Sequence, residues 1–95
     1  MRTIVRTHRF ELELHHLLQS NARAVDEFIE ATEWALSRRA EIGTPVGRTN
    51  GTEVWLLPIV DLPRVDRFIV YYTLDADHVY LLSIQISRHS PGSEK

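Results

Sequence analysis

Two neighbouring runs of β-branched and aromatic residues constrain the fold more than any other feature of this chain. The runs are residues 67–74 (RFIVYYTL) and 79–87 (VYLLSIQIS), separated by the polar residues 75–78 (DADH). Two such runs with a short polar break predict a β-hairpin. Asp75 and Asp77 favour the turn because their side chains can accept hydrogen bonds from nearby backbone N–H groups. The first run is apolar at consecutive positions, which indicates a strand in the middle of a sheet.

The second run alternates between apolar and polar residues. Its two sets are Tyr80, Leu82, Ile84 and Ile86 against Ser83, Gln85 and Ser87. Successive side chains of a strand point to opposite faces. We therefore expect the apolar set to form the core face, covered by a helix.

The first part of the chain predicts a strand and two helices. Residues 3–7 (TIVRT) are short and β-branched, which is typical of an edge strand. Apolar residues at helical spacing predict a short helix over residues 9–19 and a longer one over about 22–40, with Ser20 or Asn21 as the N-cap between them. Gly43 is expected to end the second helix.

Glycine and proline dominate the next segment. Residues 43–52 hold three of the four glycines, so we expect a loop with a turn at Asn50–Gly51. Residues 53–60 (EVWLLPIV) predict a further strand. Pro58 cannot donate a hydrogen bond to a sheet, so this strand should end, bulge or run along an edge there.

The predicted order is therefore β-α-α-β-β-β, an α+β fold with a two-helix layer packed on a small antiparallel sheet. With 95 residues, the chain has the length of one domain. We assign residues 1–88 to that domain and residues 89–95 (HSPGSEK) to a polar C-terminal tail.

Composition excludes several kinds of site. The chain has no cysteine, which removes disulfides and thiolate zinc sites. The five histidines lack paired spacing, and the glycines match no phosphate-binding loop, so we expect neither a metal nor a cofactor. No apolar run is long enough to span a bilayer. We expect no signal peptide, because no apolar segment follows the basic residues near the N-terminus. We expect a cytoplasmic protein without membrane contact.

Several ordered motifs resemble one protein family. They are FI at residues 28–29, WAL at 34–36, EIGTPV at 41–46, VWLLP at 54–58, VYYTLD at 70–75 and VYLLSI at 79–84. Together they resemble the RelE/ParE superfamily of toxins from bacterial type II toxin–antitoxin modules. The resemblance covers roughly residues 22–88 and concerns mostly core and turn positions, so it bears on fold more than on activity.

The resemblance implies two activities. RelE-like toxins enter the ribosome and cleave mRNA without a metal, whereas ParE-like toxins bind DNA gyrase. Members of both kinds are held inactive by an antitoxin. We therefore expect a toxin or toxin-like protein that binds an antitoxin and inhibits translation or gyrase. The alternatives are a ribosome-dependent mRNA endonuclease and a non-toxic interaction module with the same fold.

Candidate catalytic residues follow from the nuclease alternative. Metal-free RNA cleavage needs a base, cations that stabilise the phosphorane-like charge, and an acid. Arg67, Arg88 and His89 lie nearest to the basic positions that the resemblance implies. The resemblance also implies a tyrosine beside the basic residues. The tail holds no tyrosine and Lys95 is the only lysine, so the set of catalytic residues is incomplete. That favours protein binding as the leading interpretation.

Two tryptophans are the candidate partner-binding residues, because aromatic residues are enriched at binding hot spots. Trp34 falls opposite the apolar stripe of the longer helix, on its acidic face, and Trp55 lies in the strand before Pro58. Trp34 would anchor an antitoxin or a second copy of the chain, as in a homodimer. Alternatively it packs beneath the first helix or the N-terminal strand.

Overall fold

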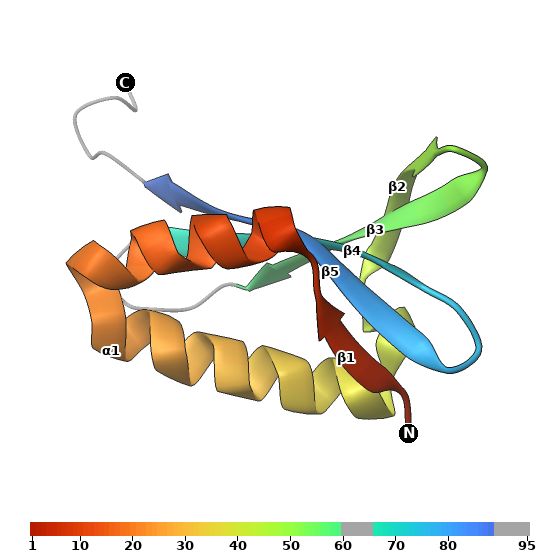
Figure 1. The fold of residues 1–95 in the computed structure, drawn as a ribbon, viewed down its shortest axis with the longest axis horizontal. Coiled ribbons are helices and arrows are strands. Elements are labelled where there is room, and N and C mark those ends of the chain that lie inside the picture. Colours follow the sequence, from red (N-terminus) through yellow and green to blue (C-terminus); the bar gives the residue numbers. More distant parts are fainter. Residues whose placement is uncertain (60–65, 89–95) are drawn as a thin grey trace.

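The computed structural model describes residues 1–59 and 66–88, without the side chains of residues 20–24, 58–59, 66–67 and 86–88. Figure 1 shows a helical layer on one face of a sheet. The elements in order are β1 (Thr3–Arg6), α1 (His8–Arg38), the short 3₁₀ helix η1 (Ala40–Ile42), β2 (Thr44–Thr49), β3 (Thr52–Ile59), β4 (Asp66–Leu74) and β5 (His78–Arg88). The α+β class is confirmed. The tail at residues 89–95 and the predicted end of a strand at Val60 lie outside the described residues.

The described residues form a sheet of five strands in the order β1-β5-β4-β3-β2, so β4 is central and β1 is at an edge, as predicted. The predicted hairpin is β4–β5, joined by the turn at Asp75. The sheet is mixed and not purely antiparallel, because β1 pairs with β5 in parallel. A parallel pair needs a long crossover connection. Here the whole of the chain between β1 and β5 forms the crossover connection. Local sequence patterns do not reveal that these two distant strands pair.

The helical layer is one helix that folds back on itself (Figure 1). A straight helix of 31 residues would be about 46 Å long. Yet Arg2 N–H donates to the Ser37 carbonyl at 2.8 Å, and Arg6 Nε lies 2.6 Å from Glu33 Oε2, so the end of α1 returns to β1. We call residues 8–19 the first arm and residues 25–38 the second arm. The layer therefore has two arms that belong to one helix. The predicted division into two helices at Ser20–Asn21 is wrong, because helical hydrogen bonding continues through these residues.

The ends of α1 also differ from the prediction. Thr7, expected in the first strand, is the N-cap: its side chain accepts a hydrogen bond from the Phe10 N–H at 3.3 Å. The helix ends at Arg38, before the expected Ala40, and η1 then leads to Gly43.

Both arms contribute to a single core against β4 and β5. Its buried apolar residues are Phe10, Leu14, Val25, Ile29, Leu36, Ala40, Phe68, Val70, Tyr72, Val79, Leu81 and Ile84. In β5 the buried apolar residues switch from odd-numbered positions, Val79 and Leu81, to an even-numbered one, Ile84, while the polar Ser83 beside it is also buried. The register shift between Tyr71 and Tyr72 causes this, because Tyr71 pairs with Ser83 and Tyr72 with Leu81, leaving Leu82 as a bulge. The expectation that Tyr80 and Leu82 share the core face with Ile84 is therefore wrong.

The predicted loop over residues 43–52 contains a strand, β2, whose six residues are all exposed. The turn at Asn50–Gly51 is confirmed: both residues have positive φ, 52° and 80°, as a type I′ hairpin turn requires. Proline and glycine suggested a loop, but Pro45 lies on the outer strand of the sheet and a bulge follows it, where a missing ladder bond is tolerated. Pro58 in β3 lies beyond the last β2 pair, Thr44 with Leu56, so β3 is locally an edge there, as expected.

One tyrosine joins the helical layer to the sheet. The Tyr72 hydroxyl donates to the Ala40 carbonyl at 2.7 Å and accepts from the Gly43 N–H at 3.0 Å. Only a glycine fits at position 43, because a Cβ there would lie 2.5 Å from the Tyr72 hydroxyl and 2.7 Å from the Leu56 carbonyl. This contact fixes where the chain leaves the helix and enters β2.

Candidate partner-binding surfaces

The predicted catalytic residues lie at the end of the β4–β5 hairpin away from its turn. Asp66 pairs with Arg88, and Arg67 pairs with Ser87. The backbones of Arg67 and Arg88 are therefore one ladder position apart, on neighbouring strands but not directly opposite each other. His89 lies outside the described residues. The structure thus brings two of the three predicted positions to one end of the sheet.

Trp34 is the most prominent aromatic residue on the surface of the second arm. Trp34 is 62% exposed, and the Arg38 guanidinium lies 4.3 Å from the centre of the indole ring. Arg38 also donates to the Trp34 carbonyl at 3.4 Å. Trp34 therefore does not pack beneath the first arm or β1. A rigid aromatic ring beside a cation is the type of residue that anchors protein interfaces.

Trp55 has a different environment. It lies on β3 opposite Tyr72, with the two ring centres 6.1 Å apart, and it packs against the edge of the core. Its side chain is half-buried. Its main contacts are internal, so of the two predicted anchors only Trp34 presents most of its surface to solvent.

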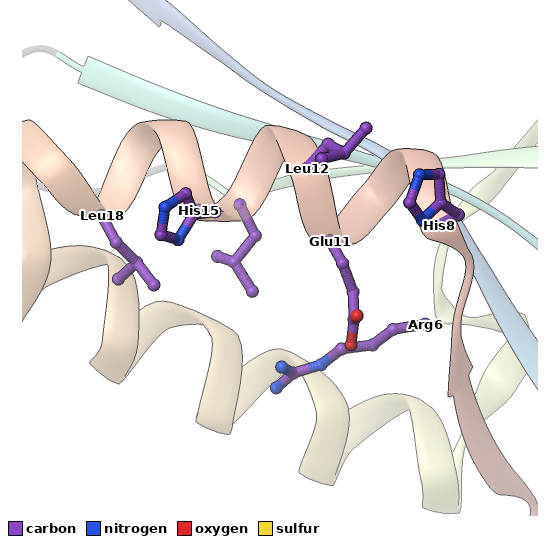
Figure 2. A pocket seen from close by; sticks show the side chains of 7 residues that line it. Arg6, His8, Glu11, Leu12, His15 and Leu18 are labelled. Atoms are coloured by element: carbon purple, nitrogen blue, oxygen red, sulfur yellow. The ribbon is translucent and has the colours of Figure 1, made fainter.

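A groove lies along the first arm where it follows β1 (Figure 2). It encloses about 340 Å³ and is lined by Arg6, His8, Glu11, Leu12, Leu14, His15 and Leu18. Figure 2 shows Arg6 reaching from β1 into the space below Glu11. Arg6 binds Glu33 through two hydrogen bonds, of 2.6 and 3.2 Å. The bond to Glu33 raises the pKa of Arg6 in spite of partial burial. Because its guanidinium is already paired, Arg6 ties β1 to the second arm and is not available for an anion.

A second groove lies on the other side of the first arm. It encloses about 390 Å³ and is lined by Leu12, Glu13, His16, Leu17 and Ile84. Leu12 stands between the two grooves with 59% of its surface exposed. Only one lining side chain, Glu13, is an acid or a strong base, so this surface is suited to an apolar occupant.

Glu13 connects the first arm to β5. Its Oε1 accepts hydrogen bonds from the Ser83 hydroxyl at 2.7 Å and from the Ile84 N–H at 3.0 Å, and its Oε2 lies 3.1 Å from Arg9 Nε. Partial burial favours the neutral acid, but these hydrogen bonds outweigh it and lower the pKa of Glu13. Sequence reasoning missed this residue, because only the fold brings Glu13 beside the bulge in β5.

Titratable side chains also meet at the β4–β5 turn. Asp75 Oδ1 accepts from the backbone N–H groups of Asp77 and His78 at 2.8 and 2.7 Å, and the Tyr80 hydroxyl donates to Asp75 Oδ2 at 3.3 Å. The bond from the Asp77 N–H, followed by those from His78, lowers the pKa of Asp75. Asp75 is exposed and its bonds close the turn, so this cluster serves the hairpin, as predicted for Asp75. Asp77 contributes its backbone N–H to these bonds.

Two negative findings apply to residues 1–59 and 66–88. No group of three or more His, Asp or Glu side chains converges as a metal site there. None of the helices in this part of the chain combines the length and apolar character required to cross a bilayer.

Comparisons with known proteins found no counterpart: no family model, no curated protein sequence and no solved structure matches the chain.

Proposed function

We propose that this chain is the toxin, or a toxin-like protein, of a type II toxin–antitoxin module, of the RelE/ParE kind. In this proposal its primary activity is binding a protein partner. The antitoxin holds it inactive, and free protein acts on the ribosome or on DNA gyrase.

The observation that carries the proposal is the contact that Tyr72 makes between the helical layer and the sheet. Three motifs behind the resemblance, at residues 41–46, 54–58 and 70–75, meet there. Tyr72 binds Ala40 and Gly43, and Trp55 packs beside Tyr72. These motifs are distant in sequence yet form one structural unit, so they support a common fold more strongly than any of them does alone.

Partner binding is supported by the surface of the helical layer. The second arm presents Trp34 with Arg38 beside it, and the first arm presents Leu12 between two grooves. An exposed tryptophan on one arm, and a leucine beside an apolar groove on the other, are suited to an amphipathic segment that wraps the helices.

Co-purification tests the partner directly. The product of the short reading frame adjacent to this gene should co-purify with the chain in a stable complex. Replacing Trp34 by Ala should weaken that complex by about 1–2 kcal/mol or more, because truncating a hot-spot tryptophan typically costs at least that much. Two soluble proteins that elute separately would count against the toxin–antitoxin interpretation.

The mRNA endonuclease remains the second candidate. Its support is the ladder register that places Arg67 and Arg88 one position apart at the same end of the hairpin. Primer extension on a translated mRNA should then show cleavage within codons that disappears in Arg88→Ala. Unchanged cleavage would remove Arg88 from the mechanism, and absence of cleavage would leave a non-nucleolytic target.

A further inference from the structure

β5 continues well past the strand that covers its outer side. β1 pairs only with residues 78–81, whereas β5 runs on to Arg88. Among the described strands, none pairs with residues 82–88 on the side away from β4. The second half of β5 is therefore a sheet edge, and such an edge presents backbone groups that can pair with another strand.

The direction of the edge groups follows from Glu13. The Ile84 N–H donates to Glu13, so it points away from β4. Since backbone groups alternate along a strand, the N–H groups of Ile86 and Arg88 point to the same side. Glu13 thus binds the first outward-pointing N–H group of this edge, that of Ile84, and the N–H groups of Ile86 and Arg88 follow it along β5.

The first arm of α1 forms one wall beside this edge. It starts where β1 stops, because the Thr7 N–H donates to the Leu81 carbonyl. Six residues further on it reaches Ile84 through Glu13. Six helical residues rise about 9 Å and three strand residues about 10 Å, so the arm runs alongside β5. The groove lined by Leu12, Glu13, His16, Leu17 and Ile84 lies between the two.

These features specify the occupant. A row of strand backbone groups is satisfied by an extended chain and not by a helix, whose own backbone groups are already paired. The single acid in the groove, Glu13, is already bonded to Arg9, Ser83 and Ile84. The occupant therefore needs no matching charge there, and an apolar side chain fits. Two copies of this chain paired through β5 would bring two Glu13 carboxylates into one small interface, which disfavours self-pairing.

We propose that residues 85–88 of β5, beyond the position that Glu13 occupies, receive an extended segment of a partner protein as a sixth strand, with an apolar side chain of that segment in the groove beside Leu12. Under the proposed function this segment belongs to the antitoxin, and to that extent the inference rests on it.

A peptide selection tests the surface without the antitoxin. The purified full-length chain is screened against a phage-displayed library of random peptides of about ten residues, enough for one strand. Selected peptides should carry apolar residues at alternate positions. In amide hydrogen exchange, a bound peptide should slow exchange at Ile86 and Arg88. Methylating alternate backbone nitrogens of the peptide should abolish binding.

Matched variants locate the site. Leu12→Lys changes a side chain that is 59% exposed, so the fold should persist, and it should weaken peptide binding about tenfold or more by placing a charge in the groove. Val46→Lys changes a comparably exposed residue on β2 and should leave the affinity unchanged.

Four results would overturn the proposal. The first is a failure to select any peptide, and the second is an equal loss of affinity in both variants. The third is slowed exchange confined to other elements. The fourth is slowed exchange at Ile86 and Arg88 that depends on protein concentration without peptide, which would assign the edge to a second copy. The selection depends on neither toxicity nor the antitoxin, so its failure would refute the β5 docking site and not the toxin assignment. Normal growth of a strain that makes the chain would refute the toxin assignment and not the docking site.

Discussion

The bond between Tyr72 and the end of the helical layer gives the sharpest test of the fold. Tyr72→Phe removes one hydroxyl and keeps the ring. It leaves the buried Ala40 carbonyl and the half-buried Gly43 N–H without their partner. An unsatisfied buried polar group costs about 1–3 kcal/mol, and water can reach Gly43 more easily than Ala40. We therefore expect a loss of about 2 kcal/mol in the free energy of unfolding, or about 8–16 °C in Tm for a domain of this size.

Thermal and urea unfolding followed by circular dichroism measure this loss. Tyr71→Phe is the matched control. Tyr71 is half-buried and, as the residue before Tyr72 on β4, points its side chain to the opposite face of the sheet. It should change stability by less than about 0.5 kcal/mol. If Tyr72→Phe is as stable as the parent, or if both variants lose the same amount, the hydroxyl does not fasten the helical layer to the sheet.

The same tyrosine predicts a response to alkaline pH. Burial raises the pKa of Tyr72, so the native chain holds this proton more tightly than the unfolded chain. Its contribution to stability is then fully present below the unfolded pKa of about 10 and is lost as pH rises through the folded pKa. Tyr72→Phe should lack this alkaline decline, whereas Tyr71→Phe should keep it. An identical decline in all three proteins would assign it to another group.

Three further perturbations follow from the contacts. Gly43→Ala places a Cβ 2.5 Å from the Tyr72 hydroxyl and should lower the free energy of unfolding by about 1–3 kcal/mol, measured by urea unfolding; parental stability would contradict the close packing. Glu13 has a lowered pKa, so its stabilising effect is present above the unfolded pKa of about 4.3 and is lost as pH falls through the folded value. Glu13→Gln should therefore be less stable at neutral pH and show a flatter acid decline in unfolding scans, and a parallel decline would refute this role. Trp34→Ala removes an exposed ring and should leave Tm nearly unchanged while weakening the antitoxin complex in calorimetric titration; a large drop in Tm would mean that Trp34 serves the fold.

Local patterns predicted the hairpin well, because its determinants are local. The β-branched runs and turn aspartates place β4 and β5 within one residue of their observed bounds. The parity change in β5 could not be foreseen, since the bulge at Leu82 depends on register with β4. The parallel β1–β5 pair and the reversal inside α1 also depend on distant contacts, such as Arg6 with Glu33. β2 was missed because proline and glycine, which usually mark loops, are tolerated on an outer strand.

The candidate site was predictable to a smaller extent. Helical periodicity placed Trp34 away from the core stripe, and its exposure agrees with that. Trp55 could not be assigned, because its contact with Tyr72 depends on the pairing of β3 with β4. The grooves on both sides of Leu12 and the bond from Glu13 to β5 arise only when the first arm lies along the sheet.

Growth of a bacterial strain that expresses the chain alone tests the central claim most directly. The optical density of the culture is followed after induction, and soluble protein is confirmed in the same cells. The proposed function predicts growth arrest without the partner and renewed growth when the product of the adjacent reading frame is induced as well. Normal growth of cells that accumulate soluble, folded protein would contradict the toxin assignment.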